Sequence, residues 1–327
     1  YLPPTQNTSF QQQLAGQFTG IGAELGLRDN KQIIVIAPLD GSPAIKAGIR
    51  AGDAIMGVDD VGTAGWTLSQ SVDKIRGPKG TTVTLAIMHK GDTKTTDIKI
   101  VRDTITVKSV DGWVKKIADI DGISDGVKNG ANKTNEITYI RLSQFGDNTN
   151  QDWLNLVNKL HAQMQKDGSN VKGIILDLRN NPGGYITDAQ FVAGEFLPNG
   201  KLVVMQEQGD GEKAALYVNR DGQFVNVPLI VLINKGSASA SEIVAGAMQD
   251  YGRAKLVGDT SYGKGTVQQA LDLGNGAGLH VTIAKWLTPK ETWVNGKGLT
   301  PDVPVSLDTK DLSHDTQLEK AIQELLQ

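Results

Sequence analysis

The sequence has no cysteine, which excludes a disulfide framework, a thiolate nucleophile and a cysteine zinc site. It also has no long hydrophobic run, and its longest apolar stretches fall far short of the roughly 18 residues that span a bilayer. Neither sign of charge dominates: 33 Lys and Arg stand against 36 Asp and Glu, a net charge of -3. This balance argues against nucleic-acid binding through bulk electrostatics.

The length of 327 residues favours about two domains at roughly 150 residues each. After a polar, glutamine-rich segment at residues 1–19, short strands and glycine turns continue to about residue 103. This pattern predicts a small β-rich domain over residues 20–103. Its predicted strands lie at 32–36, 54–58, 83–88 and 95–101, and its predicted helices at 42–47 and 68–75.

The rest of the chain alternates strands with longer helical patterns, which is typical of an α/β arrangement. We predict one domain over residues 104–327, to which residues 1–19 also belong. Its predicted helices are 149–165, 239–250 and 316–326. Four apolar runs predict strands buried on both faces, at 171–178, 229–233, 255–257 and 279–286.

The most informative segment is a predicted strand to residue 234, a turn of small residues over 235–241, and a helix to residue 250. A serine at such a helix start has free backbone N–H groups and the helix dipole beside it, which favour a developing negative charge. The alternative is an ordinary N-cap, in which Ser239 or Ser241 accepts hydrogen bonds from the first amides of the helix. The local pattern leaves both interpretations open.

A serine nucleophile needs a base. The chain has four histidines, none of them in an obvious catalytic turn: His89, His161, His280 and His314. A Ser-His-Asp triad is therefore poorly supported. Lys264, which follows Ser239 by 25 residues, is the other candidate. Lowering a lysine pKa from about 10.4 to about 7 costs roughly 4 to 5 kcal/mol, which burial among apolar groups can supply.

The segment around Lys264 also imitates a phosphate-binding loop, because residues 258–264 fit the pattern G-x-x-x-x-G-K. The imitation fails at the next residue, where Gly265 replaces the Ser or Thr that binds magnesium. The following residues, 266–271, continue as a β-like run and not as a clear helix. Nucleotide binding is therefore not predicted.

Two glycine-rich segments offer backbone amides. Residues 177–185 end a buried strand in a sharp turn, which suits half of an oxyanion hole or simply a turn that needs Gly-Gly. Residues 18–26 resemble a loop that receives a carboxylate. Leu25 stands where a dinucleotide-binding fingerprint requires a glycine, so that interpretation is excluded.

These motifs together resemble those of the C-terminal processing peptidases, or tail-specific proteases, serine-lysine endopeptidases with an inserted PDZ domain. The resemblance covers almost the whole chain, and its most specific segments are 236–242, 263–268 and 177–184. It implies an α/β (α+β) fold: a crotonase/ClpP-like protease core of stacked strands and helices with a small β-rich PDZ domain inserted. It also implies a longer N-terminal part than this chain contains.

The resemblance also implies roles for single residues. Ser239 corresponds to the nucleophile, Lys264 to its general base and Gln268 to a residue that orients the lysine. The backbone amides of Gly184, or less well Gly183, and of Ala240 bind the oxyanion. The following residues are implied to receive the C-terminal carboxylate of the substrate: Gly20, Ile21, Gly22 and Ala23. Arg76 is implied to couple substrate capture to the active site.

The implied partners are protein or peptide substrates with apolar C-termini, together with an adaptor or lipoprotein activator and a homodimer formed through the N-terminal part. No cofactor, metal or nucleic acid is implied, and the implied location is extracytoplasmic, in the bacterial periplasm or cell envelope. Two alternatives stay open at this point. One is a PDZ-containing binding scaffold with an inactive peptidase-like domain, and the other is an acyl-CoA enzyme of crotonase-like architecture.

Overall fold

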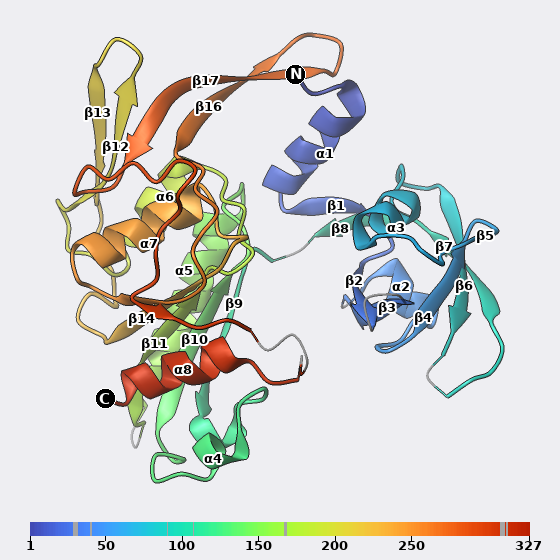
Figure 1. The fold of residues 1–327 in the computed structure, drawn as a ribbon, viewed down its shortest axis with the longest axis horizontal. Helices are drawn as coiled ribbons and strands as arrows, with labels where there is room; N and C mark the ends of the chain where they lie inside the picture. The colour runs from blue at the N-terminus through green and yellow to red at the C-terminus, as the bar shows by residue number, and fades with distance from the viewer. Residues whose placement is uncertain are drawn as a thin grey trace. The chain divides into compact units, whose positions relative to one another are not determined.

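The computed structural model describes residues 1–28, 32–39, 41–89, 91–106, 108–166, 169–307, 311 and 313–327, whose elements are shown in Figure 1. The chain divides into two compact units, one of residues 11–107 and one of residues 1–10 with 108–327. None of the described helices is long and apolar enough to cross a membrane.

The smaller unit is built on a twisted sheet with the strand order β2-β3-β4-β6-β7. The strands are β2 (Ala23–Arg28), β3 (Gln32–Pro38), β4 (Ala54–Val58), β6 (Thr82–Met88) and β7 (Thr96–Val101), and β5 (Val61–Gly62) pairs with β4. Alternate residues of β6 are buried, as a one-sided sheet requires: Val83, Leu85 and Ile87. They pack in one core that also contains Ile75.

Two helices and a strand pair complete this unit. The helices are α2 (Pro43–Lys46) and α3 (Leu68–Ile75). Thr67 and Gln70 form a reciprocal capping box at the start of α3. At the ends of the unit, β1 (Gln17–Gly20) pairs antiparallel with β8 (Asp103–Thr106). The elements predicted for this part of the sequence are confirmed, with small shifts at their ends.

The larger unit contains a six-stranded sheet in the order β18-β15-β14-β11-β10-β9. The strands are β9 (Val110–Lys116), β10 (Glu136–Leu142), β11 (Val171–Asp177), β14 (Leu229–Ile233), β15 (Lys255–Gly258) and β18 (Val303–Pro304). Neighbouring strands from β10 to β18 are parallel, and β9 is antiparallel to β10. Parallel strands are joined by crossovers, and helices therefore cover both faces.

Strand β14 shows how the two faces are used, because all five of its residues are buried. Leu229, Val231 and Ile233 belong to the core that holds α5 (Thr149–Met164), α6 (Ile186–Ala193) and α7 (Ala240–Asp250). Ile230 and Leu232 belong to a second core with α8 (Thr316–Leu325). The prediction of strands buried on both faces is thereby confirmed for β11, β14 and β15.

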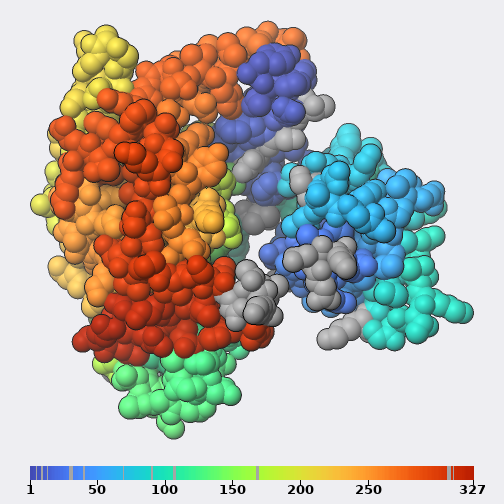
Figure 2. Space-filling model, viewed as in Figure 1, coloured from blue at the N-terminus to red at the C-terminus, as the bar shows by residue number. Residues whose placement is uncertain are grey.

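Helix α8 covers its face of this sheet, in red in Figure 1. Figure 2 shows that these C-terminal residues lie at the surface of the unit. The short elements η1 (Ile117–Asp119) and α4 (Asp125–Lys128) lie in the connection between β9 and β10. Ile117 and Ile120 from this connection pack into the same core as α8.

A second, four-stranded antiparallel sheet has the order β13-β12-β17-β16. Its strands are β12 (Leu202–Gln208), β13 (Lys213–Tyr217), β16 (Thr266–Asp272) and β17 (Gly278–Leu287). The prediction that residues 279–286 form a strand buried on both faces is wrong, since Val281 and Ile283 are 38% and 46% exposed. The run belongs to a hairpin of an antiparallel sheet, and the successive residues 281–283 are all exposed, so neither face of the strand is covered there.

Helix α1 (Pro4–Leu14) was not predicted, because its glutamine-rich sequence lacks an apolar stripe. Pro4 occupies the first helical position, where its missing N–H costs nothing. The preceding Leu2 forms a two-bond bridge with Gly278 at the start of β17. Asn7 adds a side-chain bond to the carbonyl of Gly276.

Candidate active site

The turn between β14 and α7 places Ser239 at the start of the helix. Ser239 has φ 56° and ψ -117°, a left-handed conformation that is strained for a residue with a side chain. Such a strained strand-to-helix turn is the geometry in which a nucleophilic serine projects from an α/β sheet. Ser239 itself is half-buried.

The neighbouring serines hold the turn together. Ser237 is fully buried, and its hydroxyl donates to the carbonyl of Leu178 at 2.9 Å. Ser241 is also fully buried, and its hydroxyl lies 2.9 Å from the carbonyl oxygen of Asn181 and 2.8 Å from that of Ala238. Both hydroxyls therefore act as structural donors inside the core.

Glu242 connects the Ser239 turn to the Lys264 segment. Its side chain is fully buried, and one carboxylate oxygen accepts from the amides of Ser239 and Lys264, each at 2.9 Å. The two amide nitrogens therefore lie no further apart than twice that distance. The other oxygen accepts from Ser261 Oγ at 2.6 Å and from the amide of Gly263 at 2.7 Å. One carboxylate thus fixes both segments.

Lys264 is half-buried, and its backbone is held from both sides. Its amide donates to Glu242, and its carbonyl accepts from the indole of the fully buried Trp286 at 2.8 Å. A second indole, that of Trp293, donates to the carbonyl of Gly265 at 2.8 Å. The predicted β-run after Lys264 is confirmed as β16, so no helix follows the glycine-lysine pattern.

The side chains of Lys264 and Gln268 are both free for interaction. Neither forms a hydrogen bond or ion pair with any residue that the structure describes. Gln268 lies on β16 with its side chain exposed, so the structure does not bring the two together through a direct bond.

The glycine turn after β11 lies directly against the nucleophile. A Cβ added to Gly183 would be 2.7 Å from the Ser239 Cβ and 2.9 Å from the Ala240 nitrogen. The amide of Gly183 is occupied, because it donates to Asn181 Oδ1 at 2.9 Å. The amides of Gly184 and Ala240 donate to no group in the described ranges. Unoccupied N–H groups in the described structure thus lie at Ala240, next to Ser239, and at Gly184, next to the glycine that approaches Ser239.

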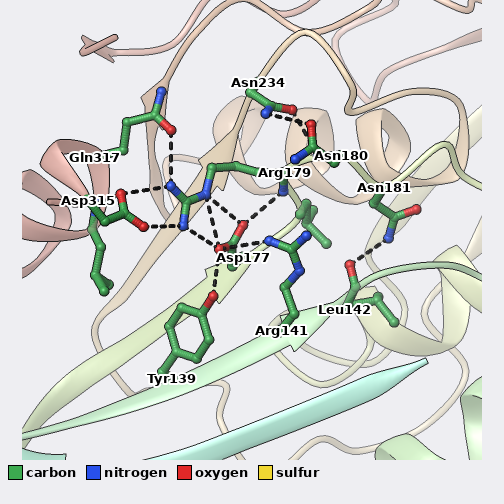
Figure 3. A network of polar contacts seen from close by, with 12 residues as sticks. Tyr139, Arg141, Leu142, Asp177, Arg179, Asn180, Asn181, Asn234, Asp315 and Gln317 are labelled. Atoms are coloured by element: carbon green, nitrogen blue, oxygen red, sulfur yellow. Dashed lines mark hydrogen bonds and ion pairs between the residues drawn. The ribbon is translucent and has the colours of Figure 1, made fainter. Parts of the chain in front are cut away.

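Asparagine side chains hold this turn on both sides. The amide of Asn180 donates to Asn234 Oδ1 at 2.8 Å, and Asn234 Nδ2 donates back to Asn180 Oδ1 at 2.9 Å. Asn181 Nδ2 donates to the carbonyl of Leu142 at 2.8 Å, as Figure 3 shows. The turn is therefore tied to the ends of β14 and β10.

A buried ionic network lies at the root of the turn (Figure 3). Asp177 has no exposed surface and accepts from Tyr139 Oη at 2.6 Å, Arg179 Nη2 at 2.6 Å and Arg141 Nη1 at 3.1 Å. Burial raises the pKa of the Asp177 carboxyl, but the charge and hydrogen bonds of Arg179, with those of Arg141, outweigh it. The net effect lowers the pKa below its usual value, so Asp177 is an anion.

The contacts of the four histidines do not form a Ser-His-Asp triad with Ser239 in the described part of the chain. His89 pairs with Asp53 at 2.8 Å in the smaller unit, and His314 pairs with Glu319 at 3.0 Å. His280 lies 4.5 Å from the Phe10 ring centroid, and burial, together with the charge of Lys264, lowers its pKa. Within the described residues no histidine bonds to Ser239, and no group of three metal-ligating side chains occurs.

The smaller unit contains a cavity of about 180 Å³ between the 20–23 loop and α3. Phe18, Leu25, Val72 and Ile75 give it apolar walls, and the predicted loop Gly20 to Ala23 forms one edge. The Arg76 guanidinium lies 5.2 Å from the Phe18 ring centroid at the same cavity.

The 20–23 loop is held by its carbonyl groups. Those of Ile21 and Gly22 accept from Ala44 at 2.8 Å and Leu39 at 2.9 Å, and Gly22 has φ 74°. The amides of Ile21 and Gly22 donate to no group among the described residues, so they are available to an anion.

Sequence reasoning missed Glu242 and the ionic network. Glu242 carried a readable signal, since a Glu three residues after a serine N-cap is the capping-box spacing. The pairing of Arg179 with Asp315 and Gln317 had no such signal, because it depends on the tertiary fold.

Comparison with known proteins relates both units to known protein families. Residues 136–305 match Peptidase family S41, and residues 11–88 match the PDZ domain. A Carboxy-terminal-processing protease of Bartonella bacilliformis is 38% identical over 93% of this chain and 65% of its own length. Carboxy-terminal processing protease CtpB of Bacillus subtilis is 33% identical over 93% of this chain and 59% of its own length. The chain thus spans about six tenths of these relatives.

Solved structures agree with this assignment. The photosystem II D1 C-terminal processing protease has a TM-score of 0.57 and 30% identity, covering 93% of this chain and 77% of that one. A putative S41 protease from Bacteroides fragilis has a TM-score of 0.67 at 16% identity, covering 94% and 83%, and supports the fold alone. The chain belongs to Peptidase family S41 and carries a PDZ domain.

Proposed function

We propose that this protein is a serine endopeptidase that captures flexible, apolar C-termini in its PDZ domain and cleaves peptide bonds with Ser239 and Lys264. One observation carries the proposal: Glu242 binds the backbones of both residues through a single carboxylate oxygen, directly beside the glycine turn that touches Ser239. These contacts support the proposal because they hold the backbones of the proposed nucleophile and base close together.

In the proposed reaction, neutral Lys264 Nζ takes the proton of Ser239 Oγ while Oγ bonds to the carbonyl carbon of the substrate. The amides of Ala240 and Gly184 donate to the resulting oxyanion. The lysine then returns the proton to the leaving amine as the C–N bond breaks. A water molecule repeats these steps, with Lys264 as base again, and releases the acid and the free serine.

Capture of the substrate is assigned to the cavity in the smaller unit. The unoccupied amides of Ile21 and Gly22 suit a terminal carboxylate, and the apolar walls suit an apolar last side chain. This part of the proposal is tested separately, by titrating peptides that end in a carboxylate or in an amide. The amide-capped peptide is expected to bind at least tenfold more weakly, and equal binding would contradict capture of the C-terminus.

Cleavage is tested by mass spectrometry of an unfolded protein with an apolar C-terminus after incubation with the chain. Ser239→Ala and Lys264→Ala are expected to abolish the fragments. Lys235→Ala is the matched control, because Lys235 is an exposed lysine of the nucleophile turn, and it should keep activity. Full activity of Lys264→Ala would refute the mechanism. Peptide binding without any cleavage by the parent would favour a scaffold.

Gln268 and Arg76 are proposed to assist the reaction without taking part in bond making or breaking. Gln268 is proposed to orient Lys264 from β16, the strand that follows the lysine, and Gln268→Ala should then lower kcat and leave KM almost unchanged. Arg76 is proposed to couple peptide capture to cleavage. Arg76→Ala should impair long, apolar-tailed substrates more than short ones, whereas Lys74→Ala, an exposed lysine of α3, should impair neither.

Location and assembly are proposals as well. We propose that the protein works outside the cytoplasm of a bacterium, as a homodimer controlled by an adaptor or lipoprotein. Cell fractionation and light scattering of the full-length protein test the location and the dimer, and co-purification tests the adaptor.

A further inference from the structure

Arg179 is the residue that leads from β11 into the glycine turn, and its guanidinium is buried. Its exposed fraction is 7%, and each of its three nitrogens donates to an acceptor. Nε lies 3.0 Å from both oxygens of Asp177, and Nη2 donates to Asp177 Oδ2 at 2.6 Å. Asp177 thus occupies only one side of the guanidinium.

The other side is occupied by α8, which lies far away in the sequence (Figure 3). Asp315 accepts from Arg179 Nη1 at 2.9 Å and from Nη2 at 2.8 Å, a two-pronged pair. The fully buried Gln317 accepts from Nη1 at 3.1 Å. All the donors of Arg179 therefore have partners only when α8 is docked.

These contacts affect the turn because a buried guanidinium is costly to leave unpaired. If Asp315 is lost, Nη1 and Nη2 keep fewer acceptors, and the side chain gains by rotating toward water. The backbone of Arg179 belongs to the same network, because its amide donates to Asp177 Oδ1 at 2.9 Å, so a shift of the ion pair changes how this backbone is held. Asn180 follows directly, with φ 56°, and the turn continues to Gly183 and Gly184.

We propose that Asp315 and Gln317 are positioning residues of the active site: through Arg179, they make the docking of the C-terminal helix a condition for a correctly placed glycine turn. The inference rests on the proposed function, in which the Gly184 amide binds the oxyanion. Neither residue bonds to that amide, so both act through Arg179. The start of α8, and not the whole helix, thereby positions the glycine turn.

The test compares Asp315→Asn with Glu324→Gln. Asn at 315 keeps the size of the side chain and an oxygen that can accept from the amide of Leu318, the existing N-cap bond at 2.9 Å. It replaces one acceptor of Arg179 by an NH₂ group. Glu324 anchors the other end of α8 to Lys255 at 2.8 Å without contacting Arg179, so it is the matched control.

Two measurements are made on the whole chain. The first is hydrogen exchange of the peptide that contains residues 178–185, and the second is kcat and KM for an unfolded substrate. Asp315→Asn is expected to speed exchange in this peptide and to lower kcat at least tenfold, with KM within twofold of the parent. Glu324→Gln should leave both within twofold.

Unchanged exchange and unchanged kcat in Asp315→Asn would overturn the inference. So would equal losses in both variants, because they would show only a loosened helix. If the parent proves inert toward every substrate while Asp315→Asn alone speeds exchange in the turn, the coupling stands and the proposed function falls. Exchange therefore separates the two proposals.

Discussion

Replacing Glu242 by glutamine tests how the active site is held together. The carboxylate is fully buried and has four hydrogen-bond donors but no cation among the described residues. Glutamine has nearly the same shape, yet one of its two terminal atoms is an NH₂ group. On one side that group meets two backbone amides, those of Ser239 and Lys264. On the other it meets the amide of Gly263 and the Ser261 hydroxyl, which can turn and accept.

The size of the effect follows from this count. One or two of the four bonds are lost, and hydrogen bonds to charged groups contribute roughly 1.5 to 3 kcal/mol each, so we expect a destabilisation of about 1.5 to 6 kcal/mol. If about 3 kcal/mol of this displaces Lys264 from Ser239 in the transition state, kcat falls roughly 100-fold, since 1.36 kcal/mol is a factor of ten. KM should change little, because Glu242 lies beneath the site.

The assay measures kcat and KM for an unfolded substrate, with urea unfolding of the same samples. Glu195→Gln is the matched control: Glu195 is also fully buried and accepts from Trp153 and Arg220, but contacts neither Ser239 nor Lys264. It should lose stability and keep kcat per folded molecule. A Glu242→Gln variant with the kcat of the parent would refute the reasoning, as would an equal fall of kcat in the control.

Three further predictions concern other parts of the molecule. Burial raises the pKa of Asp188 to about 6 from its usual 3.8, so the stability that its neutral form contributes is lost as pH rises from about 4 to about 6. Urea unfolding at several pH values in this range should show that the free energy of unfolding falls by up to about 3 kcal/mol more in the parent than in Asp188→Asn. The same pH dependence in both proteins would contradict this prediction. Gly184→Ala should abolish cleavage and unfold readily, because a Cβ there overlaps the carbonyl of Phe145. Gly200→Ala, with φ 84° and no atom nearby, should cost only about 1 kcal/mol. Arg102→Met should lower the stability of the smaller unit, seen as faster hydrogen exchange in α3, because the buried Arg102 caps the carbonyl end of that helix at 2.7 Å; unchanged exchange would refute this.

Three strands of the central sheet, β11, β14 and β15, were predictable from sequence because they obey a single strong rule, whereas β9, β10 and β18 were not predicted. Residues 171–177 and 229–233 are continuous apolar runs, and burial on two faces demands such runs. The run at 279–286 is almost as apolar, yet Val281 and Ile283 are exposed. An apolar run predicts that a strand forms, but it does not predict how many faces of that strand are buried. That number depends on which other parts of the chain pack against the strand.

The candidate site was predictable only where chemistry and local pattern coincide. Ser239 could be found from its strand, turn and helix context, and Lys264 from its flanking glycines. Glu242 has a local signal, but its contacts to residues 261–264 follow from the tertiary fold. The pairing of Arg179 with Asp315 joins residues 136 positions apart, and no spacing rule reaches that distance.

The hydrogen bonds separate the residues that hold the site in place from the groups that are proposed to meet the substrate. The groups that hold the site are saturated: Asp177, Arg179 and Glu242 are buried, and each has several partners. The groups proposed to meet the substrate, Lys264 Nζ and the amide of Gly184, have no partner among the described residues. Lys264 can therefore accept the proton of Ser239, and the Gly184 amide can donate to the substrate oxyanion, without first breaking an internal bond. Catalysis gains most from such preorganised groups, whose cost is met during folding. It follows that changes to the holding residues should lower kcat and stability together, whereas Lys264→Ala should remove catalysis and leave stability almost unchanged.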